Sequence, residues 1–155
     1  MINYFEIMGI KMEYDVDHDD LHRKYLELML ISHPDKSGQH AFDSTLLNAA
    51  YSTIKDDLLR AEHLLALNGL DVNTTKTEQA FIEDILLEFE FIETASETTL
   101  IQEKYDAKLM NKKSLFQDLK NTFNSGMMQD ALEIFVRLRY LNTLIQALSN
   151  AINRN

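Results

Sequence analysis

The chain has 155 residues, 45% of them hydrophobic, which is enough for one ordinary domain or two small ones, and its 4 Gly and 1 Pro favour long helices. The absence of Cys excludes disulfides, zinc knuckles and cysteine nucleophiles, and it fits a reducing, cytoplasmic location. The formal net charge of −10 is spread over both halves, since residues 1–70 carry 12 acids and 6 bases and residues 71–155 carry 13 and 9. We therefore expect neither nucleic acid nor a membrane as a partner.

The first predicted helix is short, covers residues 4–8 and ends at Gly9. A second helix is predicted to begin in the acidic segment 15–20, whose carboxylates suit the positive end of a helix dipole. Its apolar face is predicted from the spacing of Leu21, Tyr25, Leu28 and Met29. We expect it to end at Ser32-His33, because Pro34 disfavours helical geometry in the residue before it.

After a loop over residues 34–40, a third amphipathic helix is predicted. Its apolar side consists of Leu47, Ala50, Tyr51, Ile54 and Leu58. A shorter fourth helix follows and is closed by Asn68-Gly69, a typical C-terminal stop. The polar, β-branched residues 70–76 are predicted to separate two structural units.

Two helices are predicted over residues 77–94 and 96–124, capped by Thr77 and Ser96. Ser125-Gly126 separates them from the last helix. That helix carries a coiled-coil-like seam formed by Ile134, Leu138, Leu141, Ile145, Leu148 and Ile152. A matching stripe on the helix before it consists of Leu109, Phe116, Leu119 and Phe123. The three helices are predicted to form an antiparallel bundle.

The tripeptide His33-Pro34-Asp35 lies between two predicted amphipathic helices, which pack antiparallel and project their connection at one end. The proline ring stiffens this connection. The imidazole offers a hydrogen-bond donor and an acceptor, and the carboxylate offers a charged acceptor. This combination predicts a pre-organised polar tip that binds another protein.

Several segments of the chain carry a family resemblance. They are Tyr4-Phe5-x-x-Met8-Gly9, His33-Pro34-Asp35-Lys36, Leu47-Asn48-x-Ala50-Tyr51-x-x-Ile54, Leu59-Arg60-Ala61-Glu62-x-Leu64-Leu65-x-Leu67-x-Gly69, Gln79-Ala80-Phe81-Ile82 and Val136-Arg137-Leu138-Arg139-Tyr140-Leu141. The N-terminal segments resemble a J domain, the module that activates DnaK-type chaperones. Together the segments resemble the HscB family of iron–sulfur co-chaperones over essentially the whole chain.

The resemblance implies an all-α, L-shaped protein with a J domain at residues 1–69, a linker at 70–76 and a scaffold-binding three-helix bundle at 77–155. The J domain would stimulate ATP hydrolysis by a DnaK-type, HscA-like chaperone. The bundle would bind and deliver an IscU-like cluster scaffold. The chain itself would then be no enzyme and would need no cofactor and no metal, in keeping with its lack of a phosphate-binding Gly-rich loop.

The resemblance also assigns site residues. The chaperone-binding residues are His33, Pro34, Asp35, Lys36, Arg23 and Lys24. This basic patch is thin, because acidic and apolar residues fill positions 27–31. The scaffold-binding residues are Ile82, Glu83, Leu86, Leu87, Glu90, Thr94 and Tyr140.

The helix over residues 77–94 supports a binding role independently, because it has too many apolar residues for one face. Phe81, Ile85 and Ile92 are predicted to line the bundle core. A second stripe of Ile82, Leu86 and Phe89, with acids beside it, is predicted to bind a protein partner.

Alternative functions remain open from the sequence. A J domain could serve a different client, His33 and Asp35 could form an acid–base pair in an enzyme, and the C-terminal seam could form a coiled-coil subunit. The pair His18 and His22 has helical spacing but no Glu between them for a zinc-protease site. The segment 15–26 imitates a calcium loop but has Asp20 where Gly is required and Leu26 where Glu is required.

Overall fold

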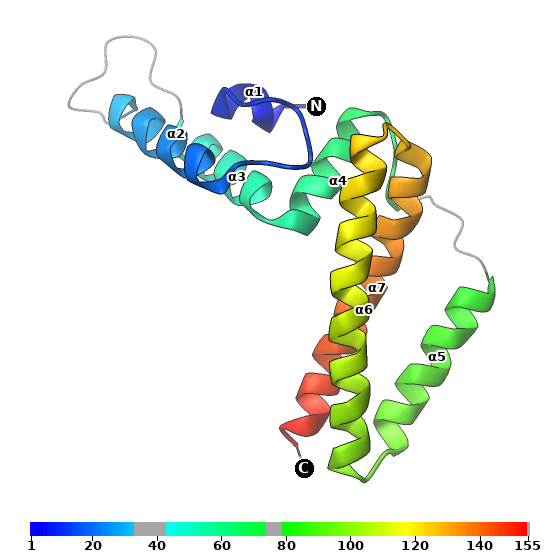
Figure 1. The fold of residues 1–155 in the computed structure, drawn as a ribbon. Coiled ribbons are helices and arrows are strands. Elements are labelled where there is room, and N and C mark those ends of the chain that lie inside the picture. Colours follow the sequence, from blue (N-terminus) through cyan, green and yellow to red (C-terminus); the bar gives the residue numbers. More distant parts are fainter. Residues whose placement is uncertain (33–42, 74–78, 155) are drawn as a thin grey trace. The chain divides into compact units, whose positions relative to one another are not determined.

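The computed structural model describes residues 1–32, 43–73 and 79–154, in which all regular elements are α-helices (Figure 1). The predicted all-α fold is confirmed. The chain divides into two compact units, Met1–Leu70 and Asp71–Asn155, referred to below as unit 1 and unit 2. The described helices include none that is both long and apolar enough to cross a bilayer.

Unit 1 contains four helices: α1 (Tyr4–Met8), α2 (His18–Ile31), α3 (Ser44–Lys55) and α4 (Asp57–Leu67). Each helix begins after an Asn or Asp whose side chain accepts hydrogen bonds from backbone N–H groups of the first turn. These cap residues are Asn3, Asp17, Asp43 and Asp56. Such caps replace the hydrogen bonds that the first turn of a helix lacks, at about 1 kcal/mol each. The predicted stops at Gly9 and Gly69 are confirmed, and both glycines have positive φ angles, which other residues rarely adopt.

The predicted third helix was too long. It ends at Lys55, and Leu58 belongs to α4. The reason is Asp56, whose backbone is extended and whose Oδ1 accepts hydrogen bonds from the backbone N–H groups of Leu58 and Leu59, both at 2.9 Å. One apolar pattern therefore spans two helices.

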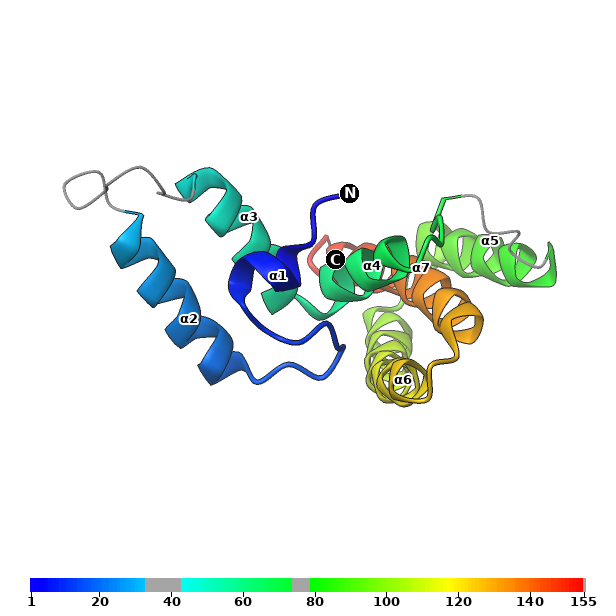
Figure 2. The same ribbon diagram turned by 90° about the horizontal axis from the view of Figure 1, so that it is seen from above.

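Helices α2 and α3 run antiparallel side by side, and α1 packs against both (Figures 1 and 2). The core of unit 1 is closed by fully buried side chains from all four helices, Phe5, Met8, Leu21, Leu47, Ala50, Ile54, Ala61 and Leu65. Of the predicted apolar face of α2, Leu21 is fully buried while Tyr25, Leu28 and Met29 are half-buried. This core holds the four helices of unit 1 together.

Unit 2 contains α5 (Gln79–Thr94), α6 (Thr98–Asn124) and α7 (Met128–Ile152). Helices α6 and α7 form an antiparallel hairpin, and α5 packs mainly against α7 (Figure 1). The predicted cap at Ser96 was wrong, because the residue before α6 is Glu97, which makes no side-chain cap hydrogen bond. The predicted cap at Thr77 lies outside the described residues.

The α7 seam was only partly right. Leu138, Leu141 and Leu148 are buried, whereas the isoleucines at 134, 145 and 152 are half-buried. Helix α7 contacts both α5 and α6, so it buries a broader surface that also includes Ala131, Leu132, Phe135, Val136, Leu144 and Ala151. On α6, Leu119 and Phe123 are buried and Phe116 is half-buried, but Leu109 is 39% exposed.

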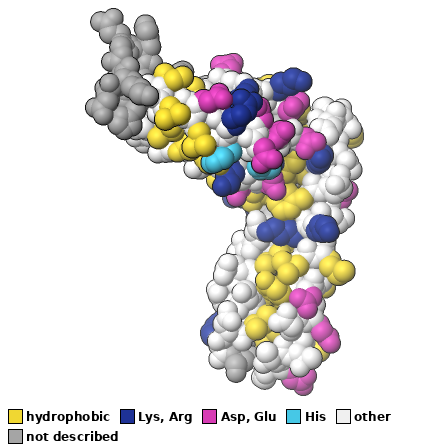
Figure 3. All heavy atoms as spheres, turned by 60° about the vertical axis from the view of Figure 1, so that its left-hand side comes forward, with side chains coloured by type: hydrophobic (Ala, Val, Ile, Leu, Met, Phe, Trp, Pro, Cys, Tyr) yellow, Lys and Arg dark blue, Asp and Glu magenta, His cyan; other side chains and the backbone are white. Residues whose placement is uncertain are grey.

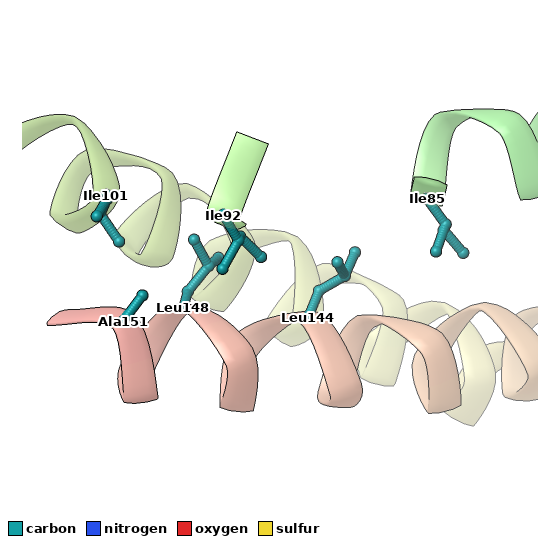
Figure 4. Packing of buried hydrophobic residues seen from close by; sticks show 6 residues of the cluster. All are labelled: Ile85, Ile92, Ile101, Leu144, Leu148 and Ala151. Atoms are coloured by element: carbon teal, nitrogen blue, oxygen red, sulfur yellow. The ribbon is translucent and has the colours of Figure 1, made fainter. Parts of the chain in front are cut away.

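One end of the bundle is held by a cluster from all three helices, Ile85, Ile92, Ile101, Leu144, Leu148 and Ala151 (Figure 4). Helix α5 contributes Ile85 and Ile92, which point toward α7. Full burial of such side chains is worth ~1.5–3 kcal/mol each, so these two residues account for much of the attachment of α5. The opposite side of α5 is left for other contacts.

Candidate functional site

The predicted chaperone-binding residues His33, Pro34, Asp35 and Lys36 lie outside the described residues. The described structure shows the helices on either side of them. Tyr25 Oη donates a hydrogen bond to Asn48 Oδ1 at 2.7 Å, and the rings of Tyr25 and Tyr51 stack with their centroids 4.2 Å apart. These contacts join α2 to α3 across the hairpin.

His22 takes part in the same contact. Its Nδ1 lies 3.0 Å from Tyr51 Oη, within hydrogen-bond distance. No group of three or more His, Asp or Glu side chains placed for metal binding occurs in the described ranges. In this structure His22 thus helps to pair two helices.

Two of the three cations that the sequence placed in the chaperone site, Arg23 and Lys24, are engaged within unit 1. Arg23 donates hydrogen bonds to Asp20 and, at 3.1 Å, to Glu27. These hydrogen bonds raise the pKa of its guanidinium, and the bond to Glu27 has the larger effect. Lys24 Nζ donates to the Gly9 carbonyl at 2.5 Å and lies 3.6 Å from Asp20 Oδ2. The two acids balance the two bases, so the described part of this patch has no net charge.

The scaffold-binding residues predicted on α5 share one exposed face of that helix. The exposed fractions are 41% for Ile82, 61% for Leu86 and 63% for Leu87, and the other three, Glu83, Glu90 and Thr94, are exposed as well. Thr94 Oγ1 donates to the Glu90 carbonyl of its own helix at 2.8 Å. The structure thus leaves three large apolar side chains in solvent with acids beside them.

The predicted second stripe of α5 needs one correction. Phe89 is half-buried and packs against the core cluster, because it lies on the side of α5 that faces α7. Leu87, and not Phe89, completes the exposed apolar face with Ile82 and Leu86. Ile85 and Ile92 are buried as predicted, and Phe81 is half-buried at the edge of the core.

A groove of about 460 Å³ lies between α5, α6 and α7 in unit 2. It brings together two predicted scaffold-binding residues, Leu87 and Tyr140. The rings of Tyr140 and Phe81 form a T-shaped pair with centroids 5.6 Å apart, and Tyr140 remains 38% exposed. Ile82 and Leu86 do not line this groove.

The rim of the groove carries charged residues that the sequence did not single out. Lys104 and Lys108 each donate to the Glu88 carboxylate at 3.0 Å, which joins α6 to α5. Burial alone would raise the pKa of Glu88, but hydrogen bonds from the two ammonium groups more than offset it and leave the pKa below its ordinary value. Arg137 lies at the rim with its guanidinium 6.0 Å from the centroid of the Phe81 ring. Charges from three helices converge here only in the folded bundle, so the spacing of residues along one helix does not reveal this cluster.

No family model matches the chain. Over 146 residues it is 32% identical to the co-chaperone protein HscB homolog of Shewanella oneidensis, and the match covers 84% of each chain. Over 153 residues it is 26% identical to the iron-sulfur cluster co-chaperone protein HscB of Mus musculus, with 92% of this chain and 65% of the mouse protein covered.

Solved structures show the same fold. Human co-chaperone protein HscB matches with a TM-score of 0.80 at 23% identity, over 97% of this chain and 82% of the human one. Chaperone HscB from Vibrio cholerae matches with a TM-score of 0.78 at 20% identity, over 99% of each chain. The similarity therefore extends through both units.

Proposed function

Since this chain belongs to the HscB family of iron–sulfur cluster co-chaperones, we propose that unit 1 stimulates the ATPase of a DnaK-type, HscA-like chaperone while unit 2 binds an IscU-like cluster scaffold and presents it to that chaperone. The phosphoryl chemistry then takes place in the partner. This chain contributes two protein-binding surfaces, one on each unit.

The chaperone-binding half rests on His33, Pro34 and Asp35, with Lys36, Arg23 and Lys24 as further candidates. The structural support is the α2–α3 hairpin, in which Tyr25 and Asn48 join the two helices at 2.7 Å. The imidazole of His33 and the carboxylate of Asp35 offer hydrogen bonds that can bias a nucleotide-dependent conformational change in the chaperone.

The scaffold-binding half rests on one observation, the exposed apolar face of α5. Ile82, Leu86 and Leu87 are 41–63% exposed on a helix that already has a buried face. Large exposed apolar side chains with a polar fringe are typical of protein interfaces. Glu83 and Glu90 provide that fringe.

The groove beside this face provides a place for an apolar anchor from the scaffold. Leu87 and Tyr140 line it together with buried residues of α5 and α7, such as Ile85 and Leu144. Aromatic residues in well-packed pockets contribute more to binding than the surrounding contacts do. We therefore expect Tyr140 to be among the residues whose loss weakens scaffold binding most.

The chaperone half is tested by single-turnover ATP hydrolysis on a purified HscA-like chaperone, with and without this protein. We expect wild type to accelerate hydrolysis and His33→Gln to lose that acceleration, because the substitution keeps size and polarity but removes the imidazole. Scaffold binding by the same variant is the control and is expected to be unchanged. Equal acceleration by wild type and His33→Gln would contradict the proposal.

The scaffold half is tested by calorimetric titration of a purified IscU-like scaffold into the full chain. Leu87→Gln and Tyr140→Ala are expected to weaken binding at least tenfold, roughly the effect of losing one apolar anchor. Met110→Gln is a matched control, because Met110 is 77% exposed on α6 and does not line the groove. If wild type activates the chaperone but does not bind the scaffold, the client is a different protein.

A further inference from the structure

Arg137 of α7 is a cation at the groove of unit 2 that lies outside the predicted binding residues. Its side chain is exposed at the rim, and its guanidinium lies over the Phe81 ring, 6.0 Å from the centroid. Within the described part of the chain it is paired with no carboxylate. The groove beside it is lined by the apolar side chains of Ile85, Leu141 and Leu144. A guanidinium in this position is available to an anionic group of a ligand.

The other two cations that the structure describes at this rim are already paired. Lys104 and Lys108 each donate to the Glu88 carboxylate at 3.0 Å, so they share one negative charge and hold α6 to α5. With Asp84, the described rim carries three cations and two acids. Acidic side chains are spread over the face shown in Figure 3, in keeping with the formal net charge of −10. The groove is therefore a locally positive site on an acidic chain, and Arg137 supplies its unpaired charge.

The guanidinium is held next to Tyr140, the predicted aromatic anchor. Arg137 and Tyr140 are three residues apart on α7 and so lie on the same side of that helix. Both side chains meet the same ring, because Tyr140 also forms its T-shaped pair with Phe81. A guanidinium that lies over an aromatic ring keeps the N–H groups in its own plane free for an anion. The three side chains thus combine a site for an apolar anchor with a site for an anion.

We propose that Arg137 binds a carboxylate of the scaffold, on a segment whose neighbouring apolar side chain occupies the groove, and that this ion pair makes the groove selective for acidic segments. The inference rests on the function proposed above and adds the chemistry of the bound segment. A carboxylate is the favoured anion, because a guanidinium can donate two parallel hydrogen bonds to it. Acids such as Glu90 disfavour a carboxylate on the exposed face of α5, which directs it to Arg137.

The test is calorimetric titration of a purified IscU-like scaffold into the full chain at low and at high potassium chloride. Arg137→Gln is expected to raise Kd roughly tenfold at low salt, because a charge-assisted, hydrogen-bonded pair is lost. Arg137→Lys is expected to fall between wild type and Arg137→Gln, since an ammonium group keeps the charge but not the two parallel donors. The difference between wild type and Arg137→Gln is expected to narrow at high salt, which screens the pair.

Arg139→Gln is the matched control. Arg139 is an exposed cation of the same helix that lies over another aromatic ring, Phe135, 5.9 Å from its centroid, but it does not line the groove. Its substitution changes the net charge of the chain by the same amount, and we expect this variant to bind the scaffold as wild type does. Both arginines are exposed, so neither substitution is expected to unfold unit 2, and circular dichroism checks this.

Equal affinity and equal salt dependence of Arg137→Gln and wild type would overturn the inference. Equal losses in Arg137→Gln and Arg139→Gln would overturn it as well, because the effect would then follow the overall charge of the chain. A loss in Arg137→Gln that is the same at low and at high salt would assign Arg137 to packing and not to an ion pair. A wild-type chain that stimulates the chaperone but does not bind the scaffold would overturn the scaffold half of the proposed function, and the inference with it.

Discussion

At the scale of single residues, the guanidinium of Arg60 joins three parts of unit 1. Arg60 is 3% exposed, and it donates to the Tyr14 carbonyl at 2.8 Å, to the Ile54 carbonyl at 2.6 Å and to the Asp57 carboxylate. Its guanidinium also lies over the Tyr14 ring, 4.8 Å from the centroid. The family motif that contains Arg60 therefore marks a structural residue at the junction of α3, α4 and the segment before α2.

Replacing Arg60 with Met is expected to destabilise unit 1 by roughly 2–4 kcal/mol, because two backbone carbonyls lose their donor in a buried setting. Urea unfolding followed by circular dichroism measures the change. Arg23→Met is the control and is expected to cost little, since Arg23 is 62% exposed. Equal stability of Arg60→Met and wild type would show that the network contributes nothing net.

His63 joins α1 to α4. Its Nε2 accepts a hydrogen bond from the backbone N–H of Tyr4 at 3.1 Å, and its ring stacks on Tyr4 and Phe5 with centroids 4.6 and 5.9 Å away. Burial lowers the pKa of His63 below the ordinary value of about 6.5. The acceptor role requires neutral imidazole, so protonation breaks the contact.

We expect this histidine to make unit 1 less stable in acid. The unfolded chain binds a proton near pH 6.5 and the folded chain only at lower pH, so the free energy of unfolding falls as the pH drops below about 6.5. Chemical unfolding at a series of pH values measures this. His63→Gln is expected to flatten the dependence in that window, and His18→Gln, at the exposed start of α2, is the control. An unchanged profile in His63→Gln would contradict the assignment.

At the scale of helices, α5 is attached to the bundle by two different means. Ile85 and Ile92 bury apolar surface in the core, and Glu88 forms ion pairs with Lys104 and Lys108 of α6. The Glu88 side chain is 22% exposed, so its carboxylate is less screened than a fully exposed one. The ion pairs close one side of the groove that Leu87 and Tyr140 line.

Glu88→Gln is expected to destabilise unit 2 by about 1 kcal/mol at neutral pH. The folded pKa of Glu88 is depressed, so its contribution is present above the ordinary value of about 4.5 and is lost as the pH falls through the folded pKa. Thermal unfolding of wild type and variant should therefore converge in acid. Glu103→Gln, which replaces an exposed acid of α6, is the control. A constant difference at every pH would exclude the ion pairs as the cause.

At the scale of the whole molecule, the proposed function requires both surfaces on one chain. A scaffold bound to unit 2 is tethered to a chaperone bound at unit 1, which raises its effective concentration to about the millimolar range for a short connection. Two half-active proteins cannot reproduce this effect.

We therefore expect a mixture of His33→Gln and Leu87→Gln chains to fail where wild type succeeds. The measurement is ATP hydrolysis by the HscA-like chaperone at low scaffold concentration, in which wild type is expected to give a larger stimulation with scaffold than without it. The mixture is expected to show no such gain. Full restoration by the mixture would show that the two surfaces act independently.

Most of the helices could be predicted from sequence, because the signals for where a helix begins and ends are local. The structure confirms the stops at Gly9 and Gly69, the acidic start of α2 and the break at Ser125-Gly126. Each of these features depends on a few neighbouring residues. The boundary at Asp56 was missed because one apolar pattern continues across two helices, and the start of α6 was misplaced because Glu97, the residue before it, makes no side-chain cap hydrogen bond. The family resemblance was likewise carried by short segments, and the relatives bear it out.

The sequence by itself determined which segments are helical and which family they belong to, because hydrophobic period, caps and motifs are properties of adjacent residues. Only the tertiary structure decided which apolar residues are buried and which charges are free. Phe89 is drawn to the core while Leu87 stays in solvent, and Glu88 of α5 pairs with Lys104 and Lys108 of α6. Those outcomes depend on which elements pack together and on the rotamers that long side chains adopt, and neither is encoded in the spacing of residues along one helix.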